Sequence, residues 1–168
     1  MSNPLNLDIP DGVPWIDFTR EFDAPVSAVW EAHADPDLVK QWLGPRGLTM
    51  EITHWDFTTG GGYRYVQTDG NGGEYAFNGV YHTIRTNELA IQTFEYEDVP
   101  GEVAIEFLTF VNLAGEGQPG RTKLVGRSIG RTVEGRDKMV ASGMEYGMAE
   151  GYERLDELLA REDVVASP

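Results

Sequence analysis

The pattern of apolar and polar positions divides the chain into extended and helical stretches. Residues 15–22 alternate between apolar and polar side chains, which is typical of a strand. The segment Asp23-Ala-Pro25 predicts a helix start, and apolar residues at helical spacing follow over 26–33. A second short helix is expected after Asp35-Pro36, and Gly44-Pro45 ends it. The first quarter of the chain therefore predicts one strand and two short helices.

The period then changes to two, which predicts six further strands separated by turns rich in Gly, Asn, Asp and Pro. Their expected bounds are 48–57, 62–68, 74–84, 88–97, 102–112 and 121–131. Short links between successive strands predict antiparallel pairing, because parallel neighbours need long crossovers. One face of each strand is apolar or aromatic and the other is polar, so one side of the sheet is expected to face solvent.

A long helix is predicted from about Arg136 to Arg161. One row on its apolar face consists of Val140, Met144, Met148 and Tyr152, and a second consists of Gly143, Gly147, Gly151, Leu155 and Leu159. Each Gly inside a helix costs ~1 kcal/mol relative to Ala. The glycines therefore indicate either close packing against the sheet or space left for a ligand. Because Ser142-Gly-Met-Glu145 matches a capping box, the main helix could instead begin at Ser142, after a separate turn at 136–141.

These elements predict one α+β domain, in which the long C-terminal helix lies across a curved antiparallel sheet. The chain has 168 residues, which is the usual size of a single domain. We expect the domain to span residues 13–162. Residues 1–12 contain turn formers and little periodicity, so a loose N-terminal tail is predicted, and residues 163–168 are expected to form a C-terminal tail.

Charge and composition exclude several classes of function. The net charge is −15, so nucleic acid and anionic membrane surfaces would be repelled, and Lys and Arg form no run. Cysteine is absent, which rules out disulfides and thiolate chemistry. No stretch resembles a secretory signal or approaches ~20 uninterrupted apolar residues, so a cytoplasmic location is expected.

No metal or cofactor is expected. The three histidines, His33, His54 and His82, fall on three different predicted elements without a ligand motif, so structural roles are favoured for them. The sequence has no nucleophile elbow or phosphate-binding loop.

Glu145 is the most interesting candidate for acid–base catalysis, because a carboxylate or His inside an apolar cavity would have a shifted pKa. Its structural alternatives are a role in the capping box or an ion pair with an arginine such as Arg20 or Arg127.

Aromatic and methionine side chains are the candidate ligand-binding groups. The period of two places Tyr63 and Tyr65 on one face, and likewise Phe77 and Tyr81. Tyrosines that face an enclosed space would suit a ligand with both aromatic and polar parts, and methionines would add adaptable walls. The complete candidate set is Trp42, Trp55, Tyr63, Tyr65, Phe77, Tyr81, Phe107, Met144 and Met148.

Several motifs occur together in an order and spacing that is specific to one family. They are Arg20-Glu-Phe-Asp-Ala-Pro25, Trp42-Leu-Gly-Pro45, Gly79-Val-Tyr81, Asn87-Glu-Leu89, and Gly135-Arg-Asp137 followed by Ser142-Gly-Met-Glu-Tyr-Gly147. From about Asp17 to Leu159 the chain resembles the activator of heat-shock protein 90 ATPase homologue 1-like family, within the START-like or Bet v 1-like (SRPBCC) superfamily. The resemblance implies a helix-grip fold, with about six to seven antiparallel strands wrapped on a long C-terminal helix.

The resemblance also implies a cavity between sheet and helix for a small hydrophobic or aromatic molecule. Non-enzymatic binding of such a molecule is the expected function. Two alternatives are a cyclase or hydrolase that uses a cavity carboxylate, His or Tyr, and a stress-related or chaperone-associated interaction protein. The family's eukaryotic namesake has an additional N-terminal domain, which is not expected here, so a direct chaperone partner is disfavoured. Whether the chain forms a homodimer is left open.

Overall fold

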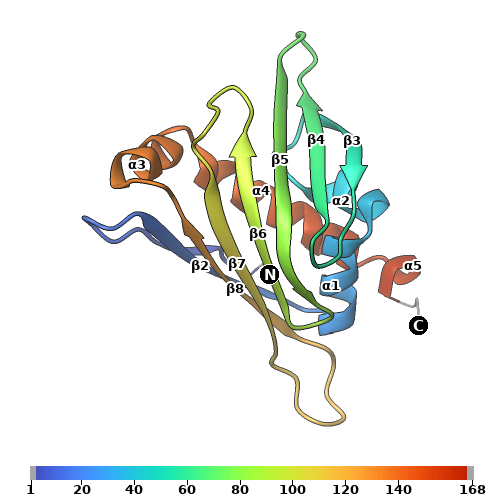
Figure 1. The fold of residues 1–168 in the computed structure, drawn as a ribbon. Coiled ribbons are helices and arrows are strands. Elements are labelled where there is room, and N and C mark those ends of the chain that lie inside the picture. The colour runs from blue at the N-terminus through green and yellow to red at the C-terminus, as the bar shows by residue number, and fades with distance from the viewer. Residues whose placement is uncertain (1–2, 166–168) are drawn as a thin grey trace.

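The computed structural model describes residues 3–165, and within them eight strands form one antiparallel sheet (Figure 1). Their order across the sheet is β1-β2-β8-β7-β6-β5-β4-β3. The strands are β1 (Asn6–Asp8), β2 (Trp15–Phe22), β3 (Thr49–Trp55), β4 (Gly62–Thr68), β5 (Glu74–Arg85), β6 (Leu89–Tyr96), β7 (Ala104–Asn112) and β8 (Thr122–Ile129). The helices are α1 (Val26–Ala34), α2 (Pro36–Trp42), α3 (Val133–Ala141), α4 (Met144–Leu159) and α5 (Glu162–Val165). The predicted α+β class is confirmed, with one strand more than expected.

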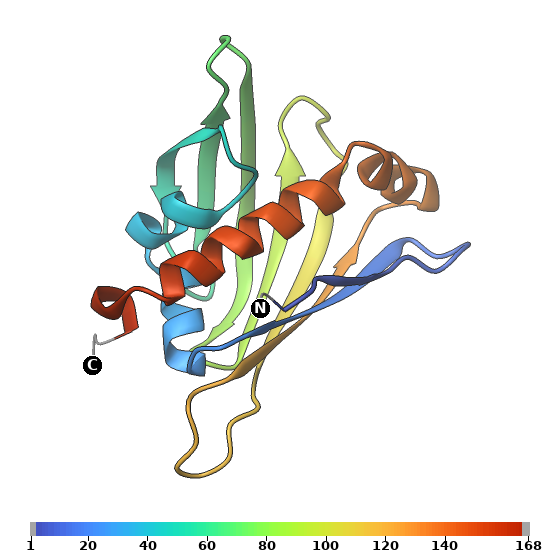
Figure 2. The same ribbon diagram turned by 180° about the vertical axis from the view of Figure 1, so that it is seen from behind.

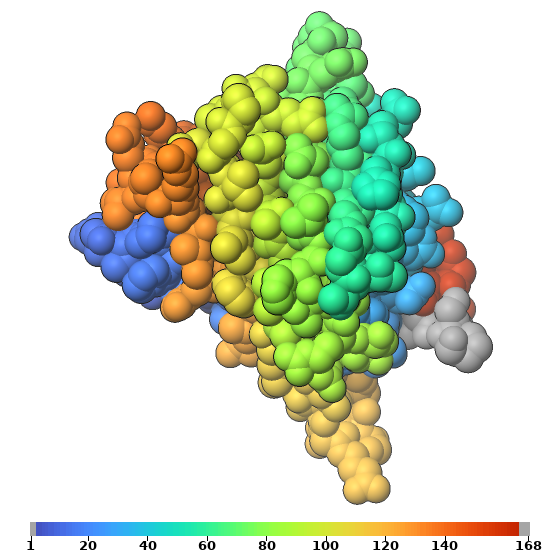
Figure 3. All heavy atoms as spheres, in the orientation of Figure 1, coloured from blue at the N-terminus to red at the C-terminus, as the bar shows by residue number. Residues whose placement is uncertain are grey.

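Helix α4 crosses one face of the sheet, as Figure 2 shows, and α1 and α2 lie beside its C-terminal half. The opposite face of the sheet carries no helix along most of its width and forms a broad outer surface (Figure 3). This arrangement is the helix-grip architecture that the sequence predicts. The concave side between sheet and helix is where the apolar side chains gather.

The main core lies at the end of the sheet near α1 and α2. The indole of Trp42 donates a hydrogen bond from Nε1 to the carbonyl of Ala32 at 2.8 Å, and Leu155 on α4 is fully buried. Arg20 is also buried, and its guanidinium pairs with the carboxylate of Asp156 at 2.5 Å. Among the helices described in residues 3–165, none combines the length and apolar character needed to cross a bilayer.

The N-terminal segment is more ordered than the loose tail that the sequence predicts. Residues 6–8 form β1, which pairs with β2 so that Leu7 lies opposite Phe18. Leu7 packs on the core, and buried Arg136 donates from its guanidinium to the carbonyl of Pro10 at 2.5 Å. Because these contacts are made to residues far away in the sequence, residues 1–12 show no periodic pattern from which the strand could have been predicted. Residues 1–2 lie outside the described residues.

The C-terminal end also differs from the expected tail. Residues 163–165 complete the short helix α5, and residues 166–168 lie outside the described range.

Of the two predicted arrangements of the C-terminal region, the structure favours the divided one: the chain turns at Gly143, and a separate helix, α3, precedes the main helix α4. Gly143 has a φ of 89°, a backbone conformation that only Gly adopts freely, and it is the N-cap of α4. The predicted capping box is wrong: the hydroxyl of Ser142 donates back to the carbonyl of Met139 at 2.6 Å. Thr132 caps α3 instead, since its side chain accepts from the amide of Gly135 at 2.9 Å.

Candidate functional site: a cavity between sheet and helix

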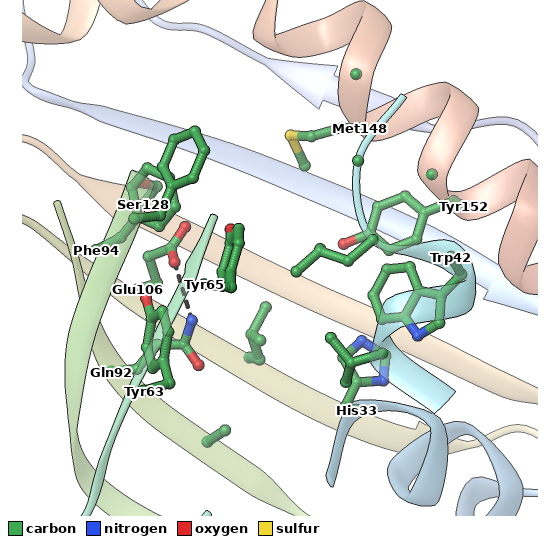
Figure 4. Close-up of a pocket in the computed structure, with 18 of the residues that line it drawn as sticks. His33, Trp42, Tyr63, Tyr65, Gln92, Phe94, Glu106, Ser128, Met148 and Tyr152 are labelled. Carbon is green, nitrogen blue, oxygen red and sulfur yellow. Dashed lines mark hydrogen bonds between the residues drawn. The ribbon is translucent and has the colours of Figure 1, made fainter. Parts of the chain in front are cut away.

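A cavity of about 330 Å³ lies between the concave face of the sheet and α4 (Figure 4). Strands β4 to β8 supply its floor, while α4 and the segment after α2 supply the opposite wall. The aromatic side chains that border it are Phe18, His33, Trp42, Trp55, Phe57, Tyr63, Tyr65, Phe77, Tyr81, Phe94, Phe110 and Tyr152. The size is sufficient for a small aromatic molecule.

Stacked aromatic rings form the part of the floor that comes from β4 and β5. The rings of Tyr63 and Tyr65 are stacked with centroids 6.1 Å apart, and Phe77 lies 5.2 Å from Tyr65. The hydroxyl of Tyr63 donates to the carbonyl of Thr93 at 2.7 Å. Burial raises the pKa of Tyr65, so this hydroxyl keeps its proton at neutral pH. The floor is therefore rigid, apolar and uncharged here.

Three polar side chains form a row across β6, β7 and β8 at one end of the cavity. Gln92 pairs in register with Glu106, and Glu106 pairs with Ser128, so the three side chains are direct cross-strand neighbours on the inner face. The amide of Gln92 donates to a carboxylate oxygen of Glu106 at 3.1 Å, the bond drawn dashed in Figure 4. We call Gln92, Glu106 and Ser128 the polar row.

Two members of the polar row are incompletely satisfied. The Ser128 hydroxyl is buried and has no hydrogen-bond partner within residues 3–165. Burial raises the pKa of the Glu106 carboxyl, and the Gln92 hydrogen bond opposes that rise only in part. Buried polar groups normally have partners. The row therefore has bonding capacity that a polar group entering the cavity could use.

His33 borders the cavity from α1, at the end away from the polar row (Figure 4). Its Nδ1 donates to the carbonyl of Val29 at 2.7 Å, which leaves Nε2 as an acceptor in the neutral ring. Burial lowers the pKa of His33 to about 4, so the imidazole is neutral at physiological pH. His54 and His82 are exposed and do not border the cavity. Within residues 3–165 no group of three or more His, Cys, Asp or Glu side chains could hold a metal ion.

The wall contributed by α4 consists of methionines, glycines and one tyrosine. Met144 and Met148 face the cavity, and the Tyr152 ring stacks on Trp42 with centroids 5.9 Å apart. A Cβ at Gly151 would lie 3.2 Å from the carbonyl oxygen of Trp42. The close packing indicated by the glycines is therefore to the segment after α2 and not to the sheet.

Eight of the nine side chains predicted for ligand binding border this cavity: Trp42, Trp55, Tyr63, Tyr65, Phe77, Tyr81, Met144 and Met148. The exception is Phe107, which faces the outer side of the sheet beside Asp17 and Arg127. The reason is the strand period, since Glu106 and Leu108 point inward and the residue between them must point outward.

Glu145 is not placed for catalysis. It lies on the exposed side of α4 and does not border the cavity. The arginines suggested as its partners are engaged elsewhere, Arg20 with Asp156 and Arg127 with Asp17 at 2.6 Å. The enzyme hypothesis therefore loses the carboxylate that was its first candidate.

The polar row was missed at the level of sequence, although the signal was present. In β7 the inward positions are Ala104, Glu106, Leu108 and Phe110, so a carboxylate interrupts an otherwise apolar alternation. Gln92 interrupts β6 in the same way, between Ala90 and Phe94.

Comparison with known proteins assigns the chain to a family. The family model described as Activator of Hsp90 ATPase homolog 1-like protein matches residues 23–160. The chain belongs to this family. Among curated proteins no sequence matches.

Solved structures of similar proteins share the architecture. A crystal structure of a Rhodobacter sphaeroides protein is 28% identical, with 93% of this chain and 98% of that chain covered and a TM-score of 0.81. An Arthrobacter aurescens protein solved by NMR is 24% identical, covers 96% of this chain and 95% of its own, and has a TM-score of 0.82. The AHSA1 protein of Silicibacter pomeroyi is 22% identical over 87% of this chain and 97% of its own, with a TM-score of 0.68.

Proposed function

We propose that this protein binds a small, mainly aromatic molecule in the cavity between the sheet and α4, without acting on it as an enzyme. The observation that carries the proposal is the cavity itself, about 330 Å³ with mainly apolar walls in which aromatic rings are frequent. Apolar surface removed from water stabilises a complex by roughly 25 cal/mol per Å². Stacked rings such as Tyr63 and Tyr65 offer flat faces for an aromatic ligand.

The two walls differ in a way that suits a binding module. Tyr63 is fixed by its hydrogen bond to the sheet, whereas Met144 and Met148 on α4 are flexible and adapt to shape. A rigid floor with an adaptable lid accepts related ligands without rearrangement of the fold.

The test is a titration with naphthylethanol, a neutral aromatic probe, monitored by the melting temperature and by calorimetry. We expect the wild-type protein to bind it and to melt at a higher temperature. The variant Met148→Trp replaces a flexible thioether chain with a bulky indole that fills the cavity, so it should abolish binding. Tyr146→Trp is the matched control, because Tyr146 lies on the same helix but is 69% exposed. Equal binding by both variants, or no binding by the wild type, would contradict the proposal.

A further inference from the structure

We propose that the ligand of this cavity carries a protonated amine, and that Glu106 binds the ammonium group at the polar row. The inference rests on the proposed function and specifies the chemical class of the ligand: an aromatic or apolar molecule with one cationic end. Its basis is the placement of a single acid among aromatic rings and neutral polar groups, on the floor of the cavity.

The polar row can accept the hydrogen bonds of an ammonium group. A carboxylate accepts about four hydrogen bonds, and the one side-chain bond that Glu106 receives within residues 3–165 comes from the Gln92 amide. The Ser128 hydroxyl beside it, which has no partner in the described chain, can act as a further acceptor. A primary amine has three N–H donors to offer, and charge-assisted bonds to a carboxylate are the strong ones.

The charge balance of the cavity favours a cation over an anion. None of the described residues that border it is Lys or Arg. The buried guanidinium of Arg20 donates to the backbone carbonyl of Tyr152 and is neutralised by Asp156. A carboxylate ligand would therefore meet the Glu106 carboxyl without a compensating positive charge, and like charges at close range repel. The net charge of −15 adds to this selection.

Aromatic rings next to the polar row would strengthen cation binding. Figure 4 shows Tyr63, Tyr65 and Phe94 in the same part of the cavity as Glu106, and all four side chains border it. The faces of such rings attract organic cations, and the attraction is larger where water is excluded. An ammonium group at Glu106 would thus lie in a cavity that holds both an anion and aromatic rings.

Glu106 is the group in the cavity whose charge can respond to a ligand. The other titratable groups that face the cavity are His33 on α1, Tyr63 and Tyr65 on β4, Tyr81 on β5 and Tyr152 on α4. The pKa of His33 is lowered to about 4, and burial raises the pKa of all four tyrosines. An ammonium group stabilises ionised Glu106, so amine affinity should increase as pH rises through the pKa of Glu106 in the free protein.

The experiment compares three probes of matched shape by calorimetry: naphthylethylamine, naphthylethanol and naphthylacetate. We expect the amine to bind wild-type protein at least about tenfold more tightly than the alcohol, because a charge-assisted bond contributes more than a neutral one. The acetate should bind most weakly. The affinity for the amine should rise with pH above about 4.5, the ordinary pKa of a Glu carboxyl, over a range in which the amine itself stays protonated.

Glu106→Gln keeps the shape and removes the charge. It should lower the amine affinity about tenfold or more, leave the alcohol affinity within about threefold, and remove the pH dependence. Glu116→Gln is the matched control for net charge, because Glu116 is exposed in the loop between β7 and β8. That variant should bind all three probes as the wild type does.

The outcomes separate this inference from the proposed function. Equal affinity for amine and alcohol, or tighter binding of the acetate, would overturn the preference for a cation while leaving aromatic binding in place. Binding of none of the three probes would contradict both. Should Glu106→Gln fail to fold, the order of the three affinities and their pH dependence in the wild-type protein still decide the inference.

Discussion

Glu106 has opposite effects on stability and on the proposed binding: its charge would destabilise the fold but would attract a cationic ligand. Its carboxyl lies on the inner face of β7 among apolar side chains and receives a hydrogen bond from Gln92. An ionised carboxylate that is shielded from water without a counter-charge destabilises the fold. A group of this kind in a cavity is characteristic of functional sites, where environments that shift pKa values are concentrated.

The Glu106→Gln variant should be more stable than the wild type when no ligand is present. Burial raises the pKa of Glu106 in the folded protein above its ordinary value of 4.5. The contribution of this group to the free energy of unfolding is therefore fully present below the pKa of the unfolded chain, and it is lost as the pH rises through the pKa of the folded protein. We expect the two proteins to have similar free energies of unfolding near pH 4.5, with the variant about 1–3 kcal/mol more stable once the pH exceeds the folded-state pKa of Glu106. Urea unfolding at several pH values measures this difference. A constant difference across the pH range would show that the charge of Glu106 is not its cause.

The sequence predicts individual positions well where only the strand period matters. Eight candidate side chains border the cavity because alternation fixes their face once the strand is known. The same rule explains why Phe107 does not border the cavity. It lies three residues from Phe110 on β7, so the two side chains point to opposite faces of the sheet. The bonding state of the polar row was beyond prediction, because Ser128 lacks a partner only in the context of the strands that surround it.

At the scale of elements, the link between α4 and the segment after α2 holds the cavity wall in place. Arg154 donates to the carbonyls of Gly44 at 3.1 Å and Gln41 at 2.9 Å. Gly44 has a φ of 90°, so the chain turns there in a conformation suited to Gly. Because Gly151 has no side chain, helix and segment approach closely enough for these bonds.

The glycines of α4 should respond differently to substitution. A Cβ at Gly147 would meet only Pro45 Cδ at an ordinary 3.7 Å, so Gly147→Ala should raise the free energy of unfolding by about 0.5–1 kcal/mol. A side chain at Gly151 would press on the backbone of Trp42 and Gly44, both at 3.2 Å, so Gly151→Val should lower it by about 1–3 kcal/mol. Denaturant unfolding distinguishes the two. Equal effects at both sites would contradict the close contact at Gly151.

Most element bounds followed from the sequence, and the exceptions have physical causes. The strand at 15–22 and the helix start at Asp35-Pro36 are confirmed. The division at Gly143 was harder to place, because Gly in a helical pattern is ambiguous until its φ is known. Strand β1 was missed because it is held by its pairing with β2, and the segment after it by the bond from Arg136 to Pro10, neither of which leaves a pattern in residues 1–12.

On the scale of the whole molecule, the cavity joins two layers that otherwise have few contacts at this position. The sheet provides the aromatic floor and the polar row, and α4 lies opposite with Met144 and Met148. A ligand that touches both layers would add contacts between them. Its binding energy would then stabilise the assembly of helix on sheet and not a single element.

Saturation with naphthylethanol should therefore slow amide hydrogen exchange in both layers. Exchange of core amides reports global stability, which at a ligand concentration of 100 times Kd rises by about 2.7 kcal/mol. We expect slower exchange in β4 to β7 and in α4, measured by mass spectrometry, and no change in Met148→Trp. Protection confined to the sheet, with α4 unaffected, would show that the probe does not bind between the layers.

The placement of the polar row on strands has a consequence for protein engineering. Gln92, Glu106 and Ser128 are held in register by backbone pairing, whereas the side chains of Met144 and Met148 project from one helix. A small combinatorial library restricted to these two helix positions would vary the shape of the accepted molecule. The preference of the polar row for the charge of the ligand would stay the same. The preferences for ligand shape and ligand charge could therefore be changed separately.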